Sequence, residues 1–126
     1  MRAVLAIAAS KGWKVHQMDV KTAFLNGKIS EEVYLEQPEG FETHNPKVFV
    51  CKLKKALYGL KQAPRAWYER IDKYITSLGF SKNEADPNFY HKKDKNDMII
   101  LILYVDDLLI TSDDHLIDQC KKDLIK

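Results

Sequence analysis

The chain has 126 residues, of which 45% are hydrophobic and 30% are charged, and its formal net charge is +2. This length suits one modest domain, and the composition excludes a disordered tail and a collagen-like repeat. The two cysteines, Cys51 and Cys120, have no spacing typical of a zinc site or a disulfide framework, so we expect a reduced, intracellular setting.

Two apolar stretches resemble targeting or membrane segments. Residues 1–10 carry an early arginine and small apolar side chains. Both a signal peptide and the start of a buried helix have this composition, and we favour the helix. Residues 98–110 are nearly all apolar, but they are shorter than the roughly 20 residues of a membrane span and contain Asp106 and Asp107. We therefore expect no transmembrane helix.

The chain opens with a helix pattern and a strand pattern. Residues 3–9 favour a helix that ends near Gly12. Residues 13–18 alternate weakly between apolar and polar side chains, which indicates a short strand. This strand places Asp19 at its end.

Turn signals and short strands follow. The pair Asn26 and Gly27 is a strong turn signal. Short strands are expected at residues 33–35 and 48–53, with a Pro-Glu-Gly turn at residues 38–40 between them.

The second half begins with the clearest helix signal. Pro64 suits the first turn of a helix, and Gly79 suits its end. Apolar side chains recur at spacings of three and four residues and form one stripe: Trp67, Ile71, Tyr74, Ile75 and Leu78.

Two further strands and a closing helix are expected after this helix. A strand begins at residues 89–90, residues 92–97 form a polar turn, and residues 98–104 form the next strand. The strand pattern resumes at residues 108–111, and residues 116–125 are typical of a helix.

These elements indicate the α+β class, with one antiparallel sheet and helices on one of its faces. Apolar segments flank Val105, Asp106 and Asp107, so the simplest geometry is a hairpin with both carboxylates at its tip. Apolar arms of this kind fix charged side chains in place without burying them unpaired.

The pair Asp106 and Asp107 differs from the other acidic pair. Asp113 and Asp114 are best explained as a cap for the last helix. Neighbouring carboxylates among apolar residues repel each other unless a cation offsets them, and Mg²⁺ prefers carboxylate oxygens. Asp19 is the best candidate for a third ligand. On the residues alone, a magnesium site and ordinary strand-end aspartates remain alternatives.

Three ordered motifs resemble the reverse transcriptases of Ty1/copia-type retrotransposons. Residues 104–107, Tyr-Val-Asp-Asp, resemble the catalytic tetrapeptide of that family. Residues 19–27 resemble its first palm motif, and residues 57–67 resemble its second motif. The intervening residues 33–41 match as well, so the resemblance covers essentially the whole chain.

The resemblance implies a reverse transcriptase domain over residues 1–126, made of a polymerase palm with part of the fingers. It implies an RNA-directed DNA polymerase that transfers a nucleotide from a dNTP to a primer 3′-hydroxyl on a template–primer. In that family two Mg²⁺ ions, replaceable by Mn²⁺, support the transfer. The matching ligands here are Asp19 and Asp106, with Asp107 supporting the metals less directly.

The same resemblance assigns substrate contacts. Phe24 would lie under the sugar of the incoming nucleotide and exclude a 2′-hydroxyl. Tyr58 and Gly59 would lie along the nucleotide and template, and Tyr104 near the primer end. The structural alternatives are a core position for Phe24 and packing under a helix for Tyr58 and Trp67, and for Trp67 we favour packing.

A local excess of basic residues surrounds the start of the expected helix. Lys54, Lys55, Lys61 and Arg65 fit contact with the phosphate backbone of a template–primer. A solvated charged face is the equal alternative.

Compared with complete family members, the chain is expected to lack the upstream fingers, the thumb and the ribonuclease H domain. We therefore expect it to act with the remaining Pol domains, integrase included, and to be inactive as an isolated chain. Two alternatives remain, a non-catalytic nucleic-acid-binding remnant and an inert retrotransposon remnant. The resemblance implies a cytoplasmic particle or the nucleus as the location.

Overall fold

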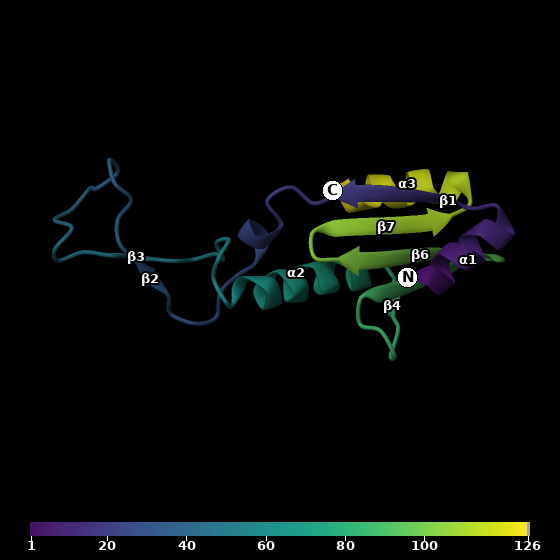
Figure 1. Cartoon of the computed structure of the whole chain (residues 1–126), viewed down its shortest axis with the longest axis horizontal. Helices are drawn as coiled ribbons and strands as arrows, with labels where there is room; N and C mark the ends of the chain where they lie inside the picture. The colour runs from purple at the N-terminus through teal and green to yellow at the C-terminus, as the bar shows by residue number, and fades with distance from the viewer. Residues whose placement is uncertain (126) are drawn as a thin grey trace. The chain divides into compact units, whose positions relative to one another are not determined.

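The chain folds into two compact units in a computed structural model that describes residues 1–125 (Figure 1). The first, called the sheet unit, consists of Met1–Lys21 and Ile71–Lys126. The second, called the inserted unit, consists of Thr22–Arg70. Each unit has a hydrophobic cluster of its own.

The sheet unit is built on a five-stranded sheet in the order β1-β7-β6-β5-β4. Every neighbouring pair is antiparallel, so the expected antiparallel sheet is confirmed. The two-residue β4 has no counterpart among the strands expected from the sequence. The strands are β1 (Lys14–Asp19), β4 (Ser81–Lys82), β5 (Phe89–Asp94), β6 (Asp97–Tyr104) and β7 (Asp107–Ser112).

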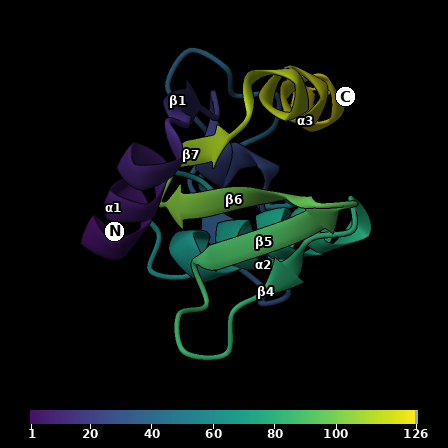
Figure 2. The same cartoon turned by 90° about the vertical axis from the view of Figure 1, so that its right-hand side faces the viewer.

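The sheet carries helices on both faces, so the expectation of helices on one face is wrong. Val4 of α1 packs against Ile100 and Ile102, which lie on one face of β6. Ile99 of β6 points to the other face, where it lines a pocket together with Leu116 of α3. Figure 2 shows α1 and α3 on opposite sides of the sheet. Since β6 is apolar along both faces, it needs cover on both. The helices are α1 (Arg2–Lys11), α2 (Ala63–Ser77) and α3 (Asp114–Ile125). Among the described residues, no helix is both long and apolar enough to cross a membrane.

The hairpin between β5 and β6 is tighter than the sequence indicates. β5 continues through Lys92 and Lys93, so the polar turn expected at residues 92–97 is wrong in its first part. The chain reverses just beyond, where Lys95 has a φ of 56°. Lys92 is compatible with the strand because its ammonium donates to the carbonyl of Leu78 at 2.8 Å and lies 5.7 Å from the centroid of the Phe80 ring.

The inserted unit has little regular structure. It contains the 3₁₀ turn η1 (Ala23–Asn26) and a two-stranded sheet of β2 (Tyr34–Leu35) and β3 (Cys51–Lys52). β3 is shorter than the strand expected at residues 48–53. Val48, Phe49 and Val50 are exposed, and high β-propensity without burial or a pairing partner does not make a strand.

Small side chains form the core of the inserted unit. Ala56, Ala63 and Ala66 are buried together, and Phe24 packs against them. Gly27 approaches α2 so closely that a Cβ on it would lie 2.8 Å from the backbone carbonyl carbon of Ala66. Its φ is −73°, so the glycine is required by this close approach rather than by a left-handed backbone.

A buried tyrosine links the sheet to α2. Tyr90 of β5 is fully buried, and its hydroxyl donates to the carboxylate of Asp72 at 2.7 Å. Lys82 forms an ion pair with the same carboxylate at 2.9 Å. Partial burial raises the pKa of Asp72, but the hydrogen bond from Tyr90 and the charge of Lys82 outweigh it, so the pKa lies below its ordinary value.

Tyr90→Phe is expected to lower the free energy of unfolding by about 1.5–3 kcal/mol at pH 7, because it removes a hydrogen bond to a carboxylate. Because the pKa of Asp72 is lower in the folded chain than its ordinary value of 3.8, the ionised carboxylate stabilises the fold at pH values above 3.8. This stabilisation is lost as the pH falls through the lowered pKa of the folded chain. The difference between the two proteins should therefore shrink between pH 7 and pH 3 in urea titrations.

The matched control is Tyr34→Phe, which removes an exposed hydroxyl that donates to Glu32 at 3.0 Å. Water replaces that partner, so the control should change stability by less than about 0.5 kcal/mol at either pH. An equal loss in the two variants would contradict the importance of the buried bond.

Candidate metal centre

Asp19 and Asp107 lie directly opposite each other across β1 and β7. In Figure 1 the arrowhead of β1 and the start of β7 lie at the same end of the sheet. The backbone amide of Val20 donates to the carbonyl of Asp106 at 2.9 Å. The next pair inward, Asp19 and Asp107, is therefore non-hydrogen-bonded, the kind in which facing side chains approach most closely.

Asp106 occupies the loop between β6 and β7. This loop has two residues, Val105 and Asp106, and Val105 has a φ of 56°. A β-branched residue at positive φ is strained, by about 1–3 kcal/mol. Such strain is often found at functional sites, where the surrounding structure holds a residue in position. Asp107 is the first residue of β7, so only Asp106 occupies the tip at which both carboxylates were expected.

The three carboxylates converge. One oxygen from each of Asp19, Asp106 and Asp107 lies within 4.8 Å of the others. Two oxygens that share one Mg²⁺ at its usual bond length are at most about 4.2 Å apart. The set is therefore a small side-chain adjustment away from a common ion. Its chemistry also fits, because all three donors are hard oxygens that Mg²⁺ and Mn²⁺ prefer.

Gln17 is a member of this site that the sequence reasoning missed. Its amide nitrogen Nε2 donates to Oδ1 of Asp107 at 3.0 Å. The two-residue period of β1 places Gln17 on the same face of the sheet as Asp19, but its bond to Asp107 follows only from the register between β1 and β7. Tyr104 opposes Asp107 on β6, and its side chain is 65% exposed on that same face.

The other aromatic candidates lie in the inserted unit. The rings of Phe24 and Tyr58 are 4.9 Å apart between centroids, and Phe24 also packs against the alanine core. Tyr58 is 55% exposed. Gly59 has a φ of 90°, a left-handed backbone conformation that favours glycine. The space where a Cβ would stand is open.

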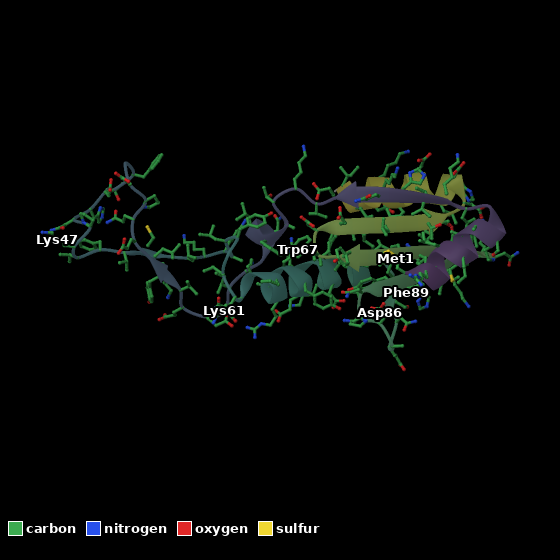
Figure 3. The ribbon with its side chains drawn as sticks, viewed as in Figure 1. Met1, Lys47, Lys61, Trp67, Asp86 and Phe89 are labelled. Carbon is green, nitrogen blue, oxygen red and sulfur yellow. The ribbon has the colours of Figure 1, made fainter. Side chains whose placement is uncertain are left out.

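The predicted basic residues are all exposed on the inserted unit. Arg65 forms ion pairs with Glu31 and Glu69, whereas Lys61 extends from the unit (Figure 3). Lys54 and Lys55 are exposed as well, and Lys55 pairs with Lys28 in an isolated antiparallel bridge. Trp67 is 4% exposed, so the packing role favoured for it is confirmed.

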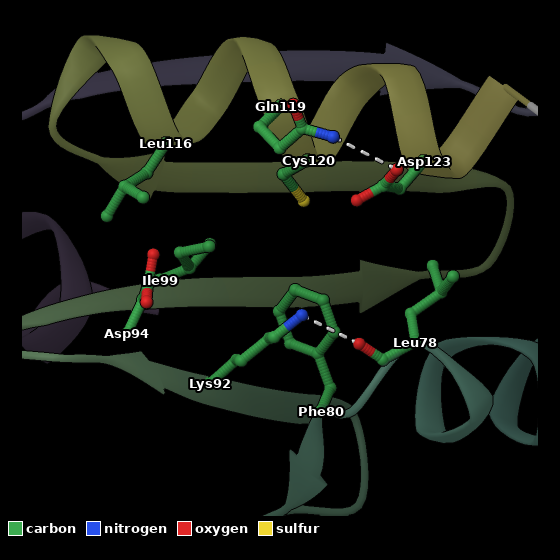
Figure 4. A pocket seen from close by; sticks show the side chains of 9 residues that line it. All are labelled: Leu78, Phe80, Lys92, Asp94, Ile99, Leu116, Gln119, Cys120 and Asp123. Atoms are coloured by element: carbon green, nitrogen blue, oxygen red, sulfur yellow. Dashed lines mark hydrogen bonds between the residues drawn. The ribbon is translucent and has the colours of Figure 1, made fainter.

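A pocket on the opposite face of the sheet lies outside the carboxylate cluster (Figure 4). It is lined by residues of α3, β5 and β6, among them Cys120. Burial, together with the charge of Asp123, raises the pKa of the Cys120 thiol to about 11. The thiol therefore stays protonated at neutral pH and is neither a nucleophile nor a metal ligand there.

Comparison with known proteins identifies the family. Residues 1–126 match the family model described as reverse transcriptase (RNA-dependent DNA polymerase). Over its whole length the chain is 52% identical to the retrovirus-related Pol polyprotein from transposon TNT 1-94 of Nicotiana tabacum. Over 90% of its length it is 42% identical to the corresponding polyprotein from transposon RE1 of Arabidopsis thaliana. Over 87% it is 32% identical to the transposon Ty1-DR5 Gag-Pol polyprotein of Saccharomyces cerevisiae.

The chain spans 10%, 8% and 6% of the length of these three relatives. No solved structure matches it. The family model covers every residue, and the relatives are Pol polyproteins of retrotransposons. The chain belongs to the reverse transcriptase family, in the Ty1/copia-type Pol polyprotein branch.

Proposed function

We propose that this chain carries the catalytic centre of an RNA-directed DNA polymerase, with Asp19, Asp106 and Asp107 as ligands of two Mg²⁺ ions. Mn²⁺ would serve in the same positions. The observation that carries the proposal is the convergence of the three carboxylates to within 4.8 Å at one end of the sheet. In this proposal the sheet unit is the palm and the inserted unit is part of the fingers.

The strands supply the rigidity that such a centre needs. Asp19 and Asp107 are held by the ladder between β1 and β7, and Asp106 by the strained loop beside them. Held by these carboxylates, Mg²⁺ would supply the positive charge that lowers the pKa of the primer 3′-hydroxyl and offsets the charge of the departing pyrophosphate. The role of the protein is to fix their carboxylate ligands and to orient the substrates.

The substrate contacts are assigned residue by residue, as the resemblance implies. Tyr104 would contact the primer end, and Phe24 would lie under the sugar of the incoming dNTP. Tyr58 and Gly59 would lie along the nucleotide and the template. The open space above Gly59 suits a close approach of nucleic acid to the backbone.

The exposed basic residues are proposed to contact the template–primer backbone. Lys54, Lys55 and Lys61 extend from the surface of the inserted unit, and Arg65 would exchange its glutamate partners for phosphate. Such contacts are electrostatic, so binding through them weakens as salt rises. The other Pol domains, including integrase, the thumb and ribonuclease H, are the proposed partners in the intact polyprotein.

The proposal is tested by grafting residues 1–126 into the Nicotiana tabacum Pol polyprotein in place of its matching segment. The purified graft should incorporate dNTPs on a primed RNA with Mg²⁺. A graft that binds template–primer in a salt-dependent manner without incorporation would favour the non-catalytic alternative. The inactivity expected of the isolated chain stays a prediction, and the same assay tests it.

Phe24→Val in this graft is expected to relax discrimination against ribonucleotides by about tenfold or more, because a smaller side chain leaves room for a 2′-hydroxyl. The measurement is the ratio of kcat/KM for dNTP to that for the matching rNTP. Leu25→Val is the control, since it introduces the same side chain at the neighbouring half-buried residue. An unchanged ratio in Phe24→Val would leave Phe24 as a packing residue of the alanine core.

A further inference from the structure

The side chain of Gln17 spans a diagonal of the β1–β7 ladder to reach Asp107. Gln17 opposes Leu109, and Asp107 is two residues away along β7 on the same face. Diagonal neighbours of this kind have Cα atoms roughly 7–8 Å apart, within reach of a long side chain. The hydrogen bond, 3.0 Å from Nε2 to Oδ1, spans this diagonal.

We propose that Gln17 is a positioning residue of the metal centre, which fixes the carboxylate of Asp107 through this hydrogen bond. The inference rests on the proposed function, because it concerns the ligand set proposed there. A carboxylate has lone pairs for about four contacts, so one amide bond to Oδ1 restrains its rotation and leaves Oδ2 for a metal. Groups that orient a ligand in this way change metal affinity without touching the metal.

The chemistry of an amide suits this position better than the alternatives. A lysine or arginine would also donate to Asp107, but its charge would compete with a divalent cation for the carboxylates. A glutamate would add a fourth negative charge to three carboxylates already within 4.8 Å of one another. Glutamine supplies a donor without a net charge, so it restrains the ligand and preserves the attraction for the metal.

The amide also offsets part of the repulsion within the site. Asp19 and Asp107 face each other in a non-hydrogen-bonded pair, and like charges directly opposite are destabilising. Without a donor on Oδ1, the carboxylate of Asp107 is expected to rotate away from Asp19. The two ligands would then have to be brought back together when the metal binds.

The first test measures Mn²⁺ binding to the 126-residue chain by the loss of the free-ion signal in electron paramagnetic resonance. Gln17→Leu is expected to raise the Kd for Mn²⁺ by about 10–100-fold. The matched control is Gln119→Leu, which removes an amide that donates to Asp123 at 3.2 Å on α3 (Figure 4). The control should leave the Kd unchanged, because that bond lies outside the carboxylate cluster.

The second test asks whether Gln17 acts through Asp107. In an Asp107→Ala background, Gln17→Leu should raise the Kd no further, because the carboxylate that it positions is gone. Additive effects of the two substitutions would overturn the proposal. A metal-free readout accompanies this test: the side-chain amide resonances of Gln17 should shift in Asp107→Ala by nuclear magnetic resonance, and unchanged resonances would contradict the bond.

The outcomes separate the inference from the function on which it rests. If the unsubstituted chain binds Mn²⁺ and Gln17→Leu binds it equally well, the positioning role is wrong and the metal centre stands. If the unsubstituted chain and Asp106→Asn give the same Kd, the metal centre is wrong, and the role of Gln17 falls with it. A higher Kd in Gln17→Leu, with no change in Gln119→Leu, supports both.

Discussion

Asp106→Asn is expected to reduce templated DNA synthesis by the grafted polyprotein by roughly 1,000-fold or more. The substitution keeps the shape of the side chain but removes the charge of a proposed metal ligand. Metal ions contribute several kcal/mol of transition-state stabilisation, and each 1.36 kcal/mol is a factor of about ten in rate. The measurement is single-turnover incorporation of one dNTP on a primed RNA.

Loss of the fold does not explain such a result. Asp106→Asn reduces the repulsion among three close carboxylates, so the free energy of unfolding should stay the same or rise by a few tenths of a kcal/mol. The control is Asp113→Asn, which makes the same chemical change just beyond β7 and should keep full activity. Synthesis that survives Asp106→Asn would reject the proposed ligand set.

Gly27→Ala is expected to lower the free energy of unfolding of the inserted unit by about 1–3 kcal/mol, the usual cost of overpacking. A Cβ at this position would lie 2.8 Å from the carbonyl carbon of Ala66 and 2.8 Å from the backbone nitrogen of Trp67. Both atoms belong to the backbone of α2 and cannot rotate away. At a φ of −73° alanine is otherwise compatible and would stabilise the chain, so the sign of the effect identifies the close approach.

The fluorescence of Trp67 reports this unfolding directly. Trp67 is buried in the inserted unit, and a Trp13→Phe background removes the only other tryptophan signal, which comes from the sheet unit. Lys28→Ala, at the exposed neighbour of Gly27, should change stability by less than about 0.5 kcal/mol. A Gly27→Ala chain as stable as the unsubstituted one would show that α2 shifts to accommodate the methyl group.

Local patterns predicted the parts of the site that are close in sequence. The hairpin around Asp106 follows from two apolar runs interrupted by polar residues, and the strand ending at Asp19 follows from a short alternation. The resemblance to a known family added the pairing of these distant segments. Gln17 was missed because its role depends on the register between β1 and β7, which no pattern within β1 contains.

The remaining differences have the same origin in tertiary context. Gly27 was recognised as a turn residue, but its need for glycine comes from the approach of α2, a segment far along the chain. The placement of α1 on the second face depends on the burial of both faces of β6. Residues 48–50 have strand propensity but no partner, and propensity alone does not distinguish them from a strand.

The positive φ of Val105 has a consequence for how the chain folds. A glycine or asparagine at this position would favour the reversal locally and allow the hairpin to form early. Valine resists the reversal, so the bend is imposed by β6 and β7 once their apolar side chains are buried. β1 then joins β7 across a long stretch of sequence, which makes it a slow, non-local pairing. The carboxylates are therefore expected to come together late, so the divalent-ion binding proposed for them should report the completed assembly of the sheet.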